Sequence, residues 1–429
     1  MRSRGRNTVA GVRQENISET AKKGSPRWNV REQKATSVVE RSMKVERVRG
    51  RMKGEQGINE LLTRAAAQGV FPGAVFLVAR KGKTILDGAY GQRATVPEKV
   101  IMNPDTVFDL ASLTKPLATT LVIMKLVNEG IILLDQCLAD LLPGAALGDK
   151  KDLTLRLLLT HSAGLVDWKP FFEKLIDYPL KDRKKVLRQW IIEEPFTYEP
   201  GKGNVYSDLG FMLLEWVIEE KTGETLPMYV YEHFYGPLGL KRTFFRGTSE
   251  KTNLRRPPFP KGERISVEEF AATEDCPWRK KVLRGEVHDD NAWTLGGSSG
   301  HAGLFSTAEE VYVIANMLRE HHLGIRRDFF KPETVREFFR RQDMVEGSDW
   351  ALGWDTRALE GSSAGKHFSR DSVGHTGFTG TSLWMDLEKD VIAILLTNRV
   401  HPKRDNDKIK QFRPVFHDAV MEALGLTSA

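Results

Sequence analysis

The chain is poor in cysteine. Its 429 residues include only two, Cys137 and Cys276. Two thiols cannot build a disulfide framework, and they cannot supply the four ligands of an all-cysteine metal site. The sequence leaves open a single bridge between them.

Long apolar runs are also missing from the sequence. The longest ones, such as VIAILL at 391–396, have the length of a strand and fall far short of the about 18 residues that cross a membrane. Residues 1–40 contain arginines but no apolar stretch after them, so no secretory signal is visible. We therefore expect no membrane span and a cytoplasmic protein.

The charge pattern gives little support to nucleic-acid binding. The formal net charge is +7, from 64 Lys and Arg against 57 Asp and Glu. Residues 1–50 hold 13 of the basic and 5 of the acidic residues, which leaves 51 against 52 in the rest of the chain. An excess of positive charge that is carried by one end of the chain alone is weak evidence for an acidic partner. We expect a small-molecule ester, amide or peptide as substrate and no nucleic acid.

Composition and periodicity divide the chain into a tail and one folded domain. Residues 1–53 are rich in Arg, Lys, Glu, Ser and Gly and have few large apolar residues, which is typical of a disordered basic tail. The domain is expected over residues 54–425. Within it we predict a sheet region at about 54–105 and 345–425, and a mainly helical region at about 106–344.

The elements predicted inside this domain alternate in type along the chain. Apolar spacing and turn residues first predict a helix ending near Gly69 and a hairpin of Ala74–Ala79 and Thr84–Tyr90. Helices are predicted next, over Lys181–Ile192, Leu209–Lys221 and Thr307–Leu318. The last part is predicted to hold strands over Ser348–Trp354, Ser372–His375, Thr381–Asp386 and Val391–Asn398, and a helix over Pro414–Leu424. The polar stretch 246–290 reads as a long excursion or lid. This order predicts an α/β fold of the α+β type. An antiparallel sheet of five or more strands, built from both chain ends, would be flanked by helices, with a helical region inserted.

The stretch FDLASLTKPLATTLVIMKLVNEG, residues 108–130, carries the first candidate for catalysis. Apolar residues at helical spacing, followed by Gly130, predict one helix that begins near Ser112. Lys115 lies one turn further on the same face, where its amine can take the serine proton if burial keeps it neutral. The start of a helix also places free N–H groups beside any oxyanion.

Ser-x-x-Lys alone is a common pattern and does not establish catalysis. A second copy, Ser363 and Lys366, lies in GSSAGK, where no helix is predicted to align the two side chains. The same helix start at Ser112 could serve an ordinary structural role. Further motifs are needed to decide between these readings.

Three short patterns occur in an order and at separations that resemble one known family. They are Ser112-Leu-Thr-Lys115, Tyr206-Ser-Asp208 and His375-Thr-Gly377. Together with FPGAVFLVARKGK at 71–83 and GHAGLFSTAEEV at 300–311, they resemble the serine β-lactamase and penicillin-binding-protein superfamily. The resemblance is closest to its class C-like branch of esterases and D-alanyl-D-alanine carboxypeptidases, and it spans nearly everything after the tail.

The resemblance implies catalytic roles for three residues. Ser112 would be the acylated nucleophile and Lys115 its proton partner. Tyr206 would act as base for acylation and for the incoming water, with a pKa lowered by the neighbouring lysine. The alternative for Tyr206 is a buried hydroxyl that caps the following helix.

The resemblance also implies substrate-binding roles at the strand and at the start of the helix. The backbone N–H of Phe378 would complete an oxyanion hole with that of the serine, beside Thr376 and the small Gly377. Asp208 departs from the family's asparagine and cannot donate a hydrogen bond to a substrate, although it could still anchor the lysine. His375 stands where β-lactamases have lysine and would hold a substrate carboxylate less firmly.

These two departures favour an ester or amide hydrolase over a true β-lactamase. The resemblance implies a carboxylesterase-like enzyme that works through an acyl-enzyme and needs no cofactor. A D-alanyl-D-alanine carboxypeptidase or β-lactamase stays open, as does a catalytically inactive binding protein on the same fold. His288, Asp289, Asp290 and His301 are metal-ligand types, but their spacing matches no helical H-E-x-x-H pattern, so we predict no metal.

Deletion of residues 1–50 is expected to leave turnover and melting temperature nearly unchanged, because this stretch carries the charge excess and no core pattern. Thermal unfolding and activity of the truncated and full-length chains, prepared side by side, check this. A large loss of either would show that the tail packs on the folded domain.

Overall fold

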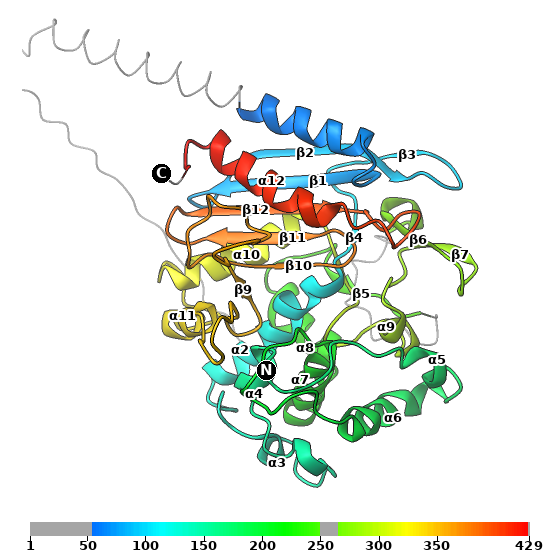
Figure 1. The fold of residues 1–429 in the computed structure, drawn as a ribbon, viewed down its shortest axis with the longest axis vertical. Helices are drawn as coiled ribbons and strands as arrows, with labels where there is room; N and C mark the ends of the chain where they lie inside the picture. Colours follow the sequence, from blue (N-terminus) through cyan, green and yellow to red (C-terminus); the bar gives the residue numbers. More distant parts are fainter. Residues whose placement is uncertain (1–53, 249–264, 428–429) are drawn as a thin grey trace, which may run out of the picture. The chain divides into compact units, whose positions relative to one another are not determined.

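A computed structural model describes residues 54–248 and 265–427. The predictions for the tail, residues 1–53, lie outside these described residues. Figure 1 shows a layered part, in which helices cover a sheet, beside a mainly helical part. No helix of the described part is long and apolar enough to cross a membrane. Both cysteines are free thiols.

The central element is a seven-stranded sheet in the order β3-β2-β1-β12-β11-β10-β9. Its strands are β1 Gly73–Arg80, β2 Lys83–Ala94, β3 Val100–Ile101, β9 Asp355–Thr356, β10 Val373–Thr376, β11 Ser382–Asp386 and β12 Val391–Thr397. Each neighbouring pair runs antiparallel, and β1 from the start of the domain pairs with β12 from its end. The predicted antiparallel sheet of five or more strands, built from both ends, is confirmed.

Strand β1 is apolar at almost every position because both of its faces are covered. Val75 and Leu77 belong to the large core cluster that extends into the helical region. Phe76 and Val78 face the other way, into a second cluster with the helix at 54–67 and with α12 (Ile409–Ala423). The two-residue period of the strand therefore divides the hydrophobic core into two layers.

The inserted region is mainly helical, as predicted. Its helices are α2 Thr120–Asn128, α3 Leu138–Leu141, α4 Leu155–Leu159, α5 Phe172–Leu175, α6 Leu180–Glu193, α7 Asp208–Thr222, α8 Leu226–Val230, α9 Asp290–Thr294, α10 Ala308–His322 and α11 Pro332–Phe339. Thr307 caps α10 by accepting the Glu310 N–H. The Glu310 carboxylate instead accepts the Arg242 N–H, so only half of a capping box forms.

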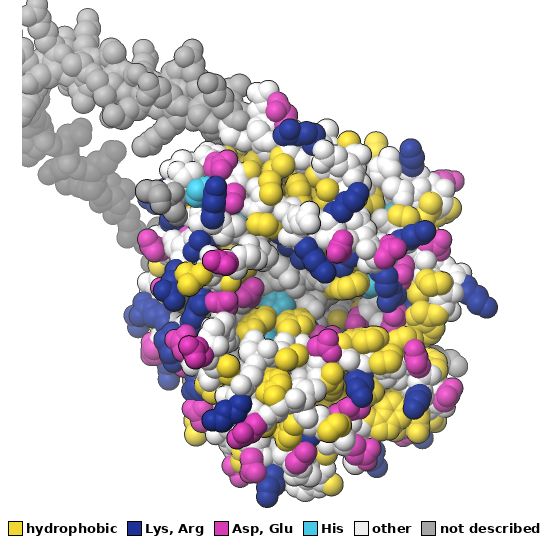
Figure 2. Space-filling view, viewed as in Figure 1, with side chains coloured by type: hydrophobic (Ala, Val, Ile, Leu, Met, Phe, Trp, Pro, Cys, Tyr) yellow, Lys and Arg dark blue, Asp and Glu magenta, His cyan; other side chains and the backbone are white. Residues whose placement is uncertain are grey.

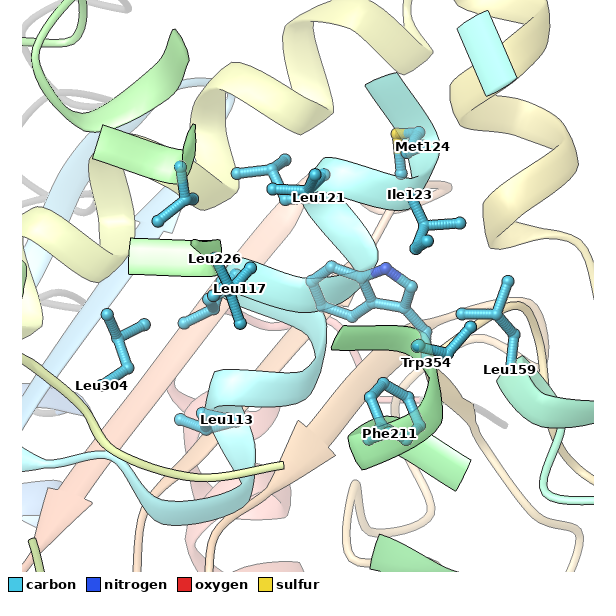
Figure 3. Packing of buried hydrophobic residues seen from close by; sticks show 14 of the residues in the cluster. Leu113, Leu117, Leu121, Ile123, Met124, Leu159, Phe211, Leu226, Leu304 and Trp354 are labelled. Carbon is cyan, nitrogen blue, oxygen red and sulfur yellow. The ribbon is translucent and has the colours of Figure 1, made fainter. Parts of the chain in front are cut away.

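The serine segment is helical but irregular, which corrects the prediction of one regular helix. After the short strand β4 (Phe108–Asp109), Ser112 lies in a 3-10 turn, η1 (Ala111–Leu113), followed by a π-helical turn, η2 (Lys115–Thr119), and then α2. Figure 3 shows that Leu113, Leu117 and Leu121 of this segment lie among side chains from distant parts of the chain. Gly130, with φ +73°, ends the segment as predicted.

One predicted element near the C-terminus is wrong, and another begins earlier than predicted. Residues 348–354 form no strand, because the N–H groups of Leu352 and Gly353 pair with the Phe338 and Leu159 carbonyls of helices α11 and α4. The predicted helix at Pro414–Leu424 is confirmed, but α12 begins earlier, at Ile409, so Pro414 lies inside it.

The stretch 246–290 is only partly an excursion. Part of it, residues 249–264, lies outside the described residues. Strands β6 (Ala272–Cys276) and β7 (Lys281–Arg284) form a hairpin that the sequence did not predict.

Leu121→Ala is expected to lower the free energy of unfolding by about 2–5 kcal/mol, because it removes a fully buried side chain and leaves a cavity. Urea unfolding followed by circular dichroism measures the change. Val415→Ala is the matched control, since Val415 is 50% exposed and its loss should cost under about 0.5 kcal/mol. Equal costs for the two variants would contradict the tight packing around the serine segment.

Candidate active site

Ser112 lies just after a strained position in the backbone. Ala111 has φ +47°, a value that favours glycine, and its N–H donates to the Asp109 carboxylate at 2.9 Å. The other oxygen of Asp109 accepts the N–H of His288 at 2.6 Å. A buried carboxylate thus holds the turn that presents the partly exposed serine.

Lys115 is fully buried and surrounded by acceptors. Its Nζ lies 3.2 Å from Ser112 Oγ, 2.6 Å from Asp208 Oδ1 and 3.2 Å from the carbonyl oxygen of His301. Burial alone would lower the pKa of the amine, but the ion pair with Asp208 and the contact with Tyr206 outweigh burial and raise it. Lys115 is therefore a charged ammonium near neutral pH.

Tyr206 lies immediately before α7, and its hydroxyl interacts with Lys115 and Ser112. The Lys115 Nζ is 4.9 Å from the centre of the tyrosine ring. Burial raises the pKa of the hydroxyl, Lys115 opposes that effect and Asp208 adds to it, with a net rise. The expectation of a lowered tyrosine pKa is therefore wrong for this site, where Tyr206 is a neutral phenol.

His375 is buried on β10 and carries no charge near neutral pH. Its Nδ1 lies 2.9 Å from the carbonyl oxygen of Thr376, so this nitrogen carries the proton. Burial and the nearby Lys115 charge lower the pKa of His375 to about 3. His375 therefore offers a substrate carboxylate a neutral imidazole and no positive charge.

The turn after β10 packs directly onto the serine segment. A Cβ at Gly377 would lie 2.1 Å from Thr381 Oγ1 and 2.5 Å from the Leu110 carbonyl oxygen, so no larger residue fits there. Next to it, Phe378 is 51% exposed. Its ring lies beside the Arg399 guanidinium, at 4.3 Å from the ring centre.

Tyr206 is surrounded by an aromatic group that the sequence did not predict. His161 and Trp350 each contact the tyrosine ring, with centroid distances of 4.6 and 5.8 Å. The Ser207 N–H donates to His161 Nδ1 at 3.0 Å, which fixes the chain beside Tyr206. His161 lies in HSAGL, residues 161–165, where the sequence favours a turn but does not indicate a contact with the tyrosine.

His301 connects the GHAG loop to the same site. Its Nε2 lies 3.0 Å from Asp289 Oδ1, and its Nδ1 lies 3.0 Å from Ser299 Oγ. Asp208, Asp289 and His301 offer metal-ligand atoms within 4.8 Å of one another. Because Asp208 already binds Lys115 and Asp289 already binds His301, these three side chains are paired with groups of the chain itself.

The second Ser-x-x-Lys copy lies elsewhere and has structural contacts. Ser363 Oγ accepts the indole N–H of Trp384 at 3.2 Å. The N–H of Lys366 donates to Asp418 on α12 at 2.8 Å.

The structure brings together Ser112, Lys115, Tyr206 and Asp208, and the ring of His375 contacts the ring of Tyr206. Figure 2 shows a hollow between the sheet part and the helical part, with histidine surface inside it.

Solved structures of several proteins share this fold. EstCE1, described as a hydrolase with promiscuous acyltransferase activity, matches with a TM-score of 0.66 and 21% identity, over 86% of this chain and 99% of that chain. The octameric penicillin-binding protein homologue from Pyrococcus abyssi matches with a TM-score of 0.63 and 18% identity, over 86% and 77%. At these identities the matches concern the fold alone.

Sequence relatives cover most of the domain. An N-acetylmuramyl-L-alanine amidase of Bacillus subtilis (strain 168) is 30% identical over 361 residues, 80% of this chain and 80% of the relative. A putative D-alanyl-D-alanine carboxypeptidase of Escherichia coli (strain K12) is 31% identical over 368 residues, 79% of this chain and 81% of the relative. The family model described as Beta-lactamase matches residues 58–414. This chain is therefore a serine hydrolase and belongs to the Beta-lactamase family.

Proposed function

We propose that Ser112 is the nucleophile of a hydrolase that cleaves neutral acyl esters through an acyl-enzyme, with a carboxylesterase-like preference. The contact that carries this proposal is the 3.2 Å separation of Ser112 Oγ from the buried ammonium of Lys115. A charge fixed there stabilises negative charge that develops on or near the serine oxygen. Tyr206 supplies a neutral hydroxyl that can protonate the leaving group.

In this proposal the N–H groups of Ser112 and Phe378 bind the oxyanion. Thr379 Oγ1 donates to the Asp109 carbonyl at 2.7 Å, and Thr381 Oγ1 donates to the Leu110 carbonyl at 3.0 Å. These bonds join the turn that carries Phe378 to the turn that carries the serine. Two donors held by one rigid unit suit oxyanion stabilisation, because they need not reorganise during the reaction.

The charges at the substrate-binding positions support an uncharged substrate. His375 is a neutral imidazole, and Asp208 is a carboxylate paired with Lys115. Neither offers a free cation to a substrate carboxylate. A substrate acid would instead approach the negative charge of Asp208, which costs on the order of 1–3 kcal/mol in a partly dry site.

Amide hydrolysis is the second candidate, and the relatives favour it. The two sequence relatives described above are named as an amidase and a putative D-alanyl-D-alanine carboxypeptidase. The same serine and oxyanion donors would serve an amide, provided that Tyr206 protonates the departing amine. β-Lactam hydrolysis remains a third candidate. A catalytically inactive binding protein is disfavoured, since the lysine and tyrosine beside the serine would then have no chemical task.

Ser112→Ala is expected to abolish both turnover and labelling by a fluorophosphonate probe, and to leave the circular dichroism spectrum and melting temperature nearly unchanged. A hydroxyl at the start of a helix contributes at most about 2 kcal/mol to stability, whereas its chemical role has no substitute. Ser363→Ala is the matched control and should label like the wild type. Labelling that persists in Ser112→Ala and disappears in Ser363→Ala would assign the nucleophile to Ser363.

The wild type should hydrolyse p-nitrophenyl butyrate measurably and nitrocefin slowly or not at all. His375→Lys should then raise kcat/KM for nitrocefin relative to the ester by about 10-fold or more, since a cation would face the β-lactam carboxylate. His233→Lys, in the turn after α8, is the matched control. Nitrocefin turnover by the wild type at rates typical of a β-lactamase would contradict the proposed substrate class.

A further inference from the structure

The serine proton needs an acceptor that the matched family motif does not supply here. Lys115 is charged near neutral pH, because Asp208 raises its pKa. Tyr206 keeps its own proton, because its pKa lies above the ordinary value. Neither of the two expected bases is therefore in its basic form in the resting enzyme.

Asp208 is the one carboxylate in direct contact with Lys115 among the interactions of the described residues. Its Oδ1 lies 2.6 Å from Nζ, which is closer than Ser112 Oγ or the His301 carbonyl oxygen, each at 3.2 Å. The backbone of Asp208 is fixed as well, since its N–H donates to the Asp167 carbonyl at 2.9 Å. Lys115 is thus placed between a hydroxyl that must lose a proton and a carboxylate that can gain one.

We propose that Asp208 accepts the serine proton through Lys115 during acylation. This inference rests on the proposed function, since it assumes that Ser112 attacks the substrate. Asp208 is then a positioning residue that acts through the lysine and replaces an asparagine amide, which has no site for the proton. The step uses groups already in hydrogen-bond contact and needs no other reactant.

The proton transfers balance over the acylation half-reaction. One Nζ proton moves to Asp208 Oδ1, which frees the nitrogen lone pair, and the Ser112 O–H bond breaks as a new Nζ–H bond forms with that lone pair. The serine oxygen bonds to the acyl carbon, and the carbonyl π electrons move onto the carbonyl oxygen. When that oxyanion collapses, Tyr206 donates its proton to the leaving group. Lys115 then passes the proton from Asp208 to the tyrosine oxygen. In total, Ser112 has lost one proton, the leaving group has gained one, and Asp208 and Tyr206 are back in their starting states.

This route restores the positive charge of the lysine as the serine loses its proton. The restored ammonium lies beside Asp208 and the His301 carbonyl, the groups that hold it in the resting enzyme. It is therefore in place when negative charge develops on the oxyanion. A charge held in a fixed position stabilises the transition state with little reorganisation.

The titratable groups that face Lys115 and Asp208 come from several elements. They are Tyr206 before α7, His161 in the turn after α4, His301 in the GHAG loop with Asp289 before α9, and His375 on β10. Burial and Lys115 lower the pKa values of His161 and His375. Burial would lower the pKa of His301, but Asp289 and Asp208 raise it.

Fluorophosphonate labelling isolates the proposed step. The probe reacts with the serine and releases fluoride, which needs no proton from Tyr206. Its second-order rate constant therefore reports probe binding and attack by the serine, without proton delivery to a leaving group. The variants are Asp208→Asn, Asp208→Glu and Tyr206→Phe, with Asp390→Asn as the control that breaks a remote ion pair to Arg319 on α10.

At pH 7 the Asp208→Asn variant should label about 100-fold more slowly than the wild type or worse. Removing the carboxylate lowers the lysine pKa, so a neutral amine forms as pH rises. The Asp208→Asn rate should then climb by about tenfold per pH unit over roughly pH 7–9, while the wild-type rate stays nearly flat. Asp208→Glu should recover at least about a tenth of the wild-type rate, and Tyr206→Phe should label faster than Asp208→Asn.

Three results would overturn the role of Asp208. One is labelling of Asp208→Asn within about fivefold of the wild type at pH 7. The second is a slow labelling rate of Asp208→Asn that does not rise with pH, together with an equally slow rate of Asp208→Glu. This would make Asp208 purely structural. The third is a labelling rate that falls further in Tyr206→Phe than in Asp208→Asn, which would make the tyrosine the proton acceptor. A wild type that is not labelled at all would instead overturn the proposed function, a result distinct from these three.

Discussion

The interaction on which the rest of the site depends is the burial of one lysine charge. Lys115 has no exposed surface, so its ammonium must find all of its partners inside the protein. It finds a carboxylate on α7, a carbonyl in the GHAG loop and the hydroxyl of Ser112. Because these groups come from three separate parts of the chain, the buried charge joins them at one point beside the nucleophile.

A second set of bonds connects the sheet to the serine segment. Asp109 uses its carboxylate to hold Ala111 and His288, and its carbonyl accepts from Thr379. Arg413 on α12 is buried and donates to the carbonyl of Gly377 at 2.6 Å. The turn after β10 is thus held by the last helix on one side and by the serine segment on the other. Such connections explain how a site between two structural regions can keep fixed geometry.

Much of the fold could be predicted from the sequence, because strands covered on both faces and capped helices leave strong local patterns. β1, β12 and α7 are examples. The site was predicted less completely. Motif spacing brought the serine and lysine together, but protonation depends on contacts between distant residues. Asp208 keeps Lys115 charged against the effect of burial, whereas burial itself, with a smaller contribution from Asp208, raises the pKa of Tyr206. The missing strand at 348–354 has the same cause, since its N–H groups pair with distant helices.

The most direct test of this account is the mass of the enzyme during turnover of an ester. Rapid acid quenching of the enzyme with p-nitrophenyl butyrate, followed by intact-mass and peptide analysis, detects a covalent butyryl group. We expect one added acyl group per chain, on the peptide that contains Ser112. Turnover with no added mass under single-turnover conditions, or an acyl group on another residue, would contradict it.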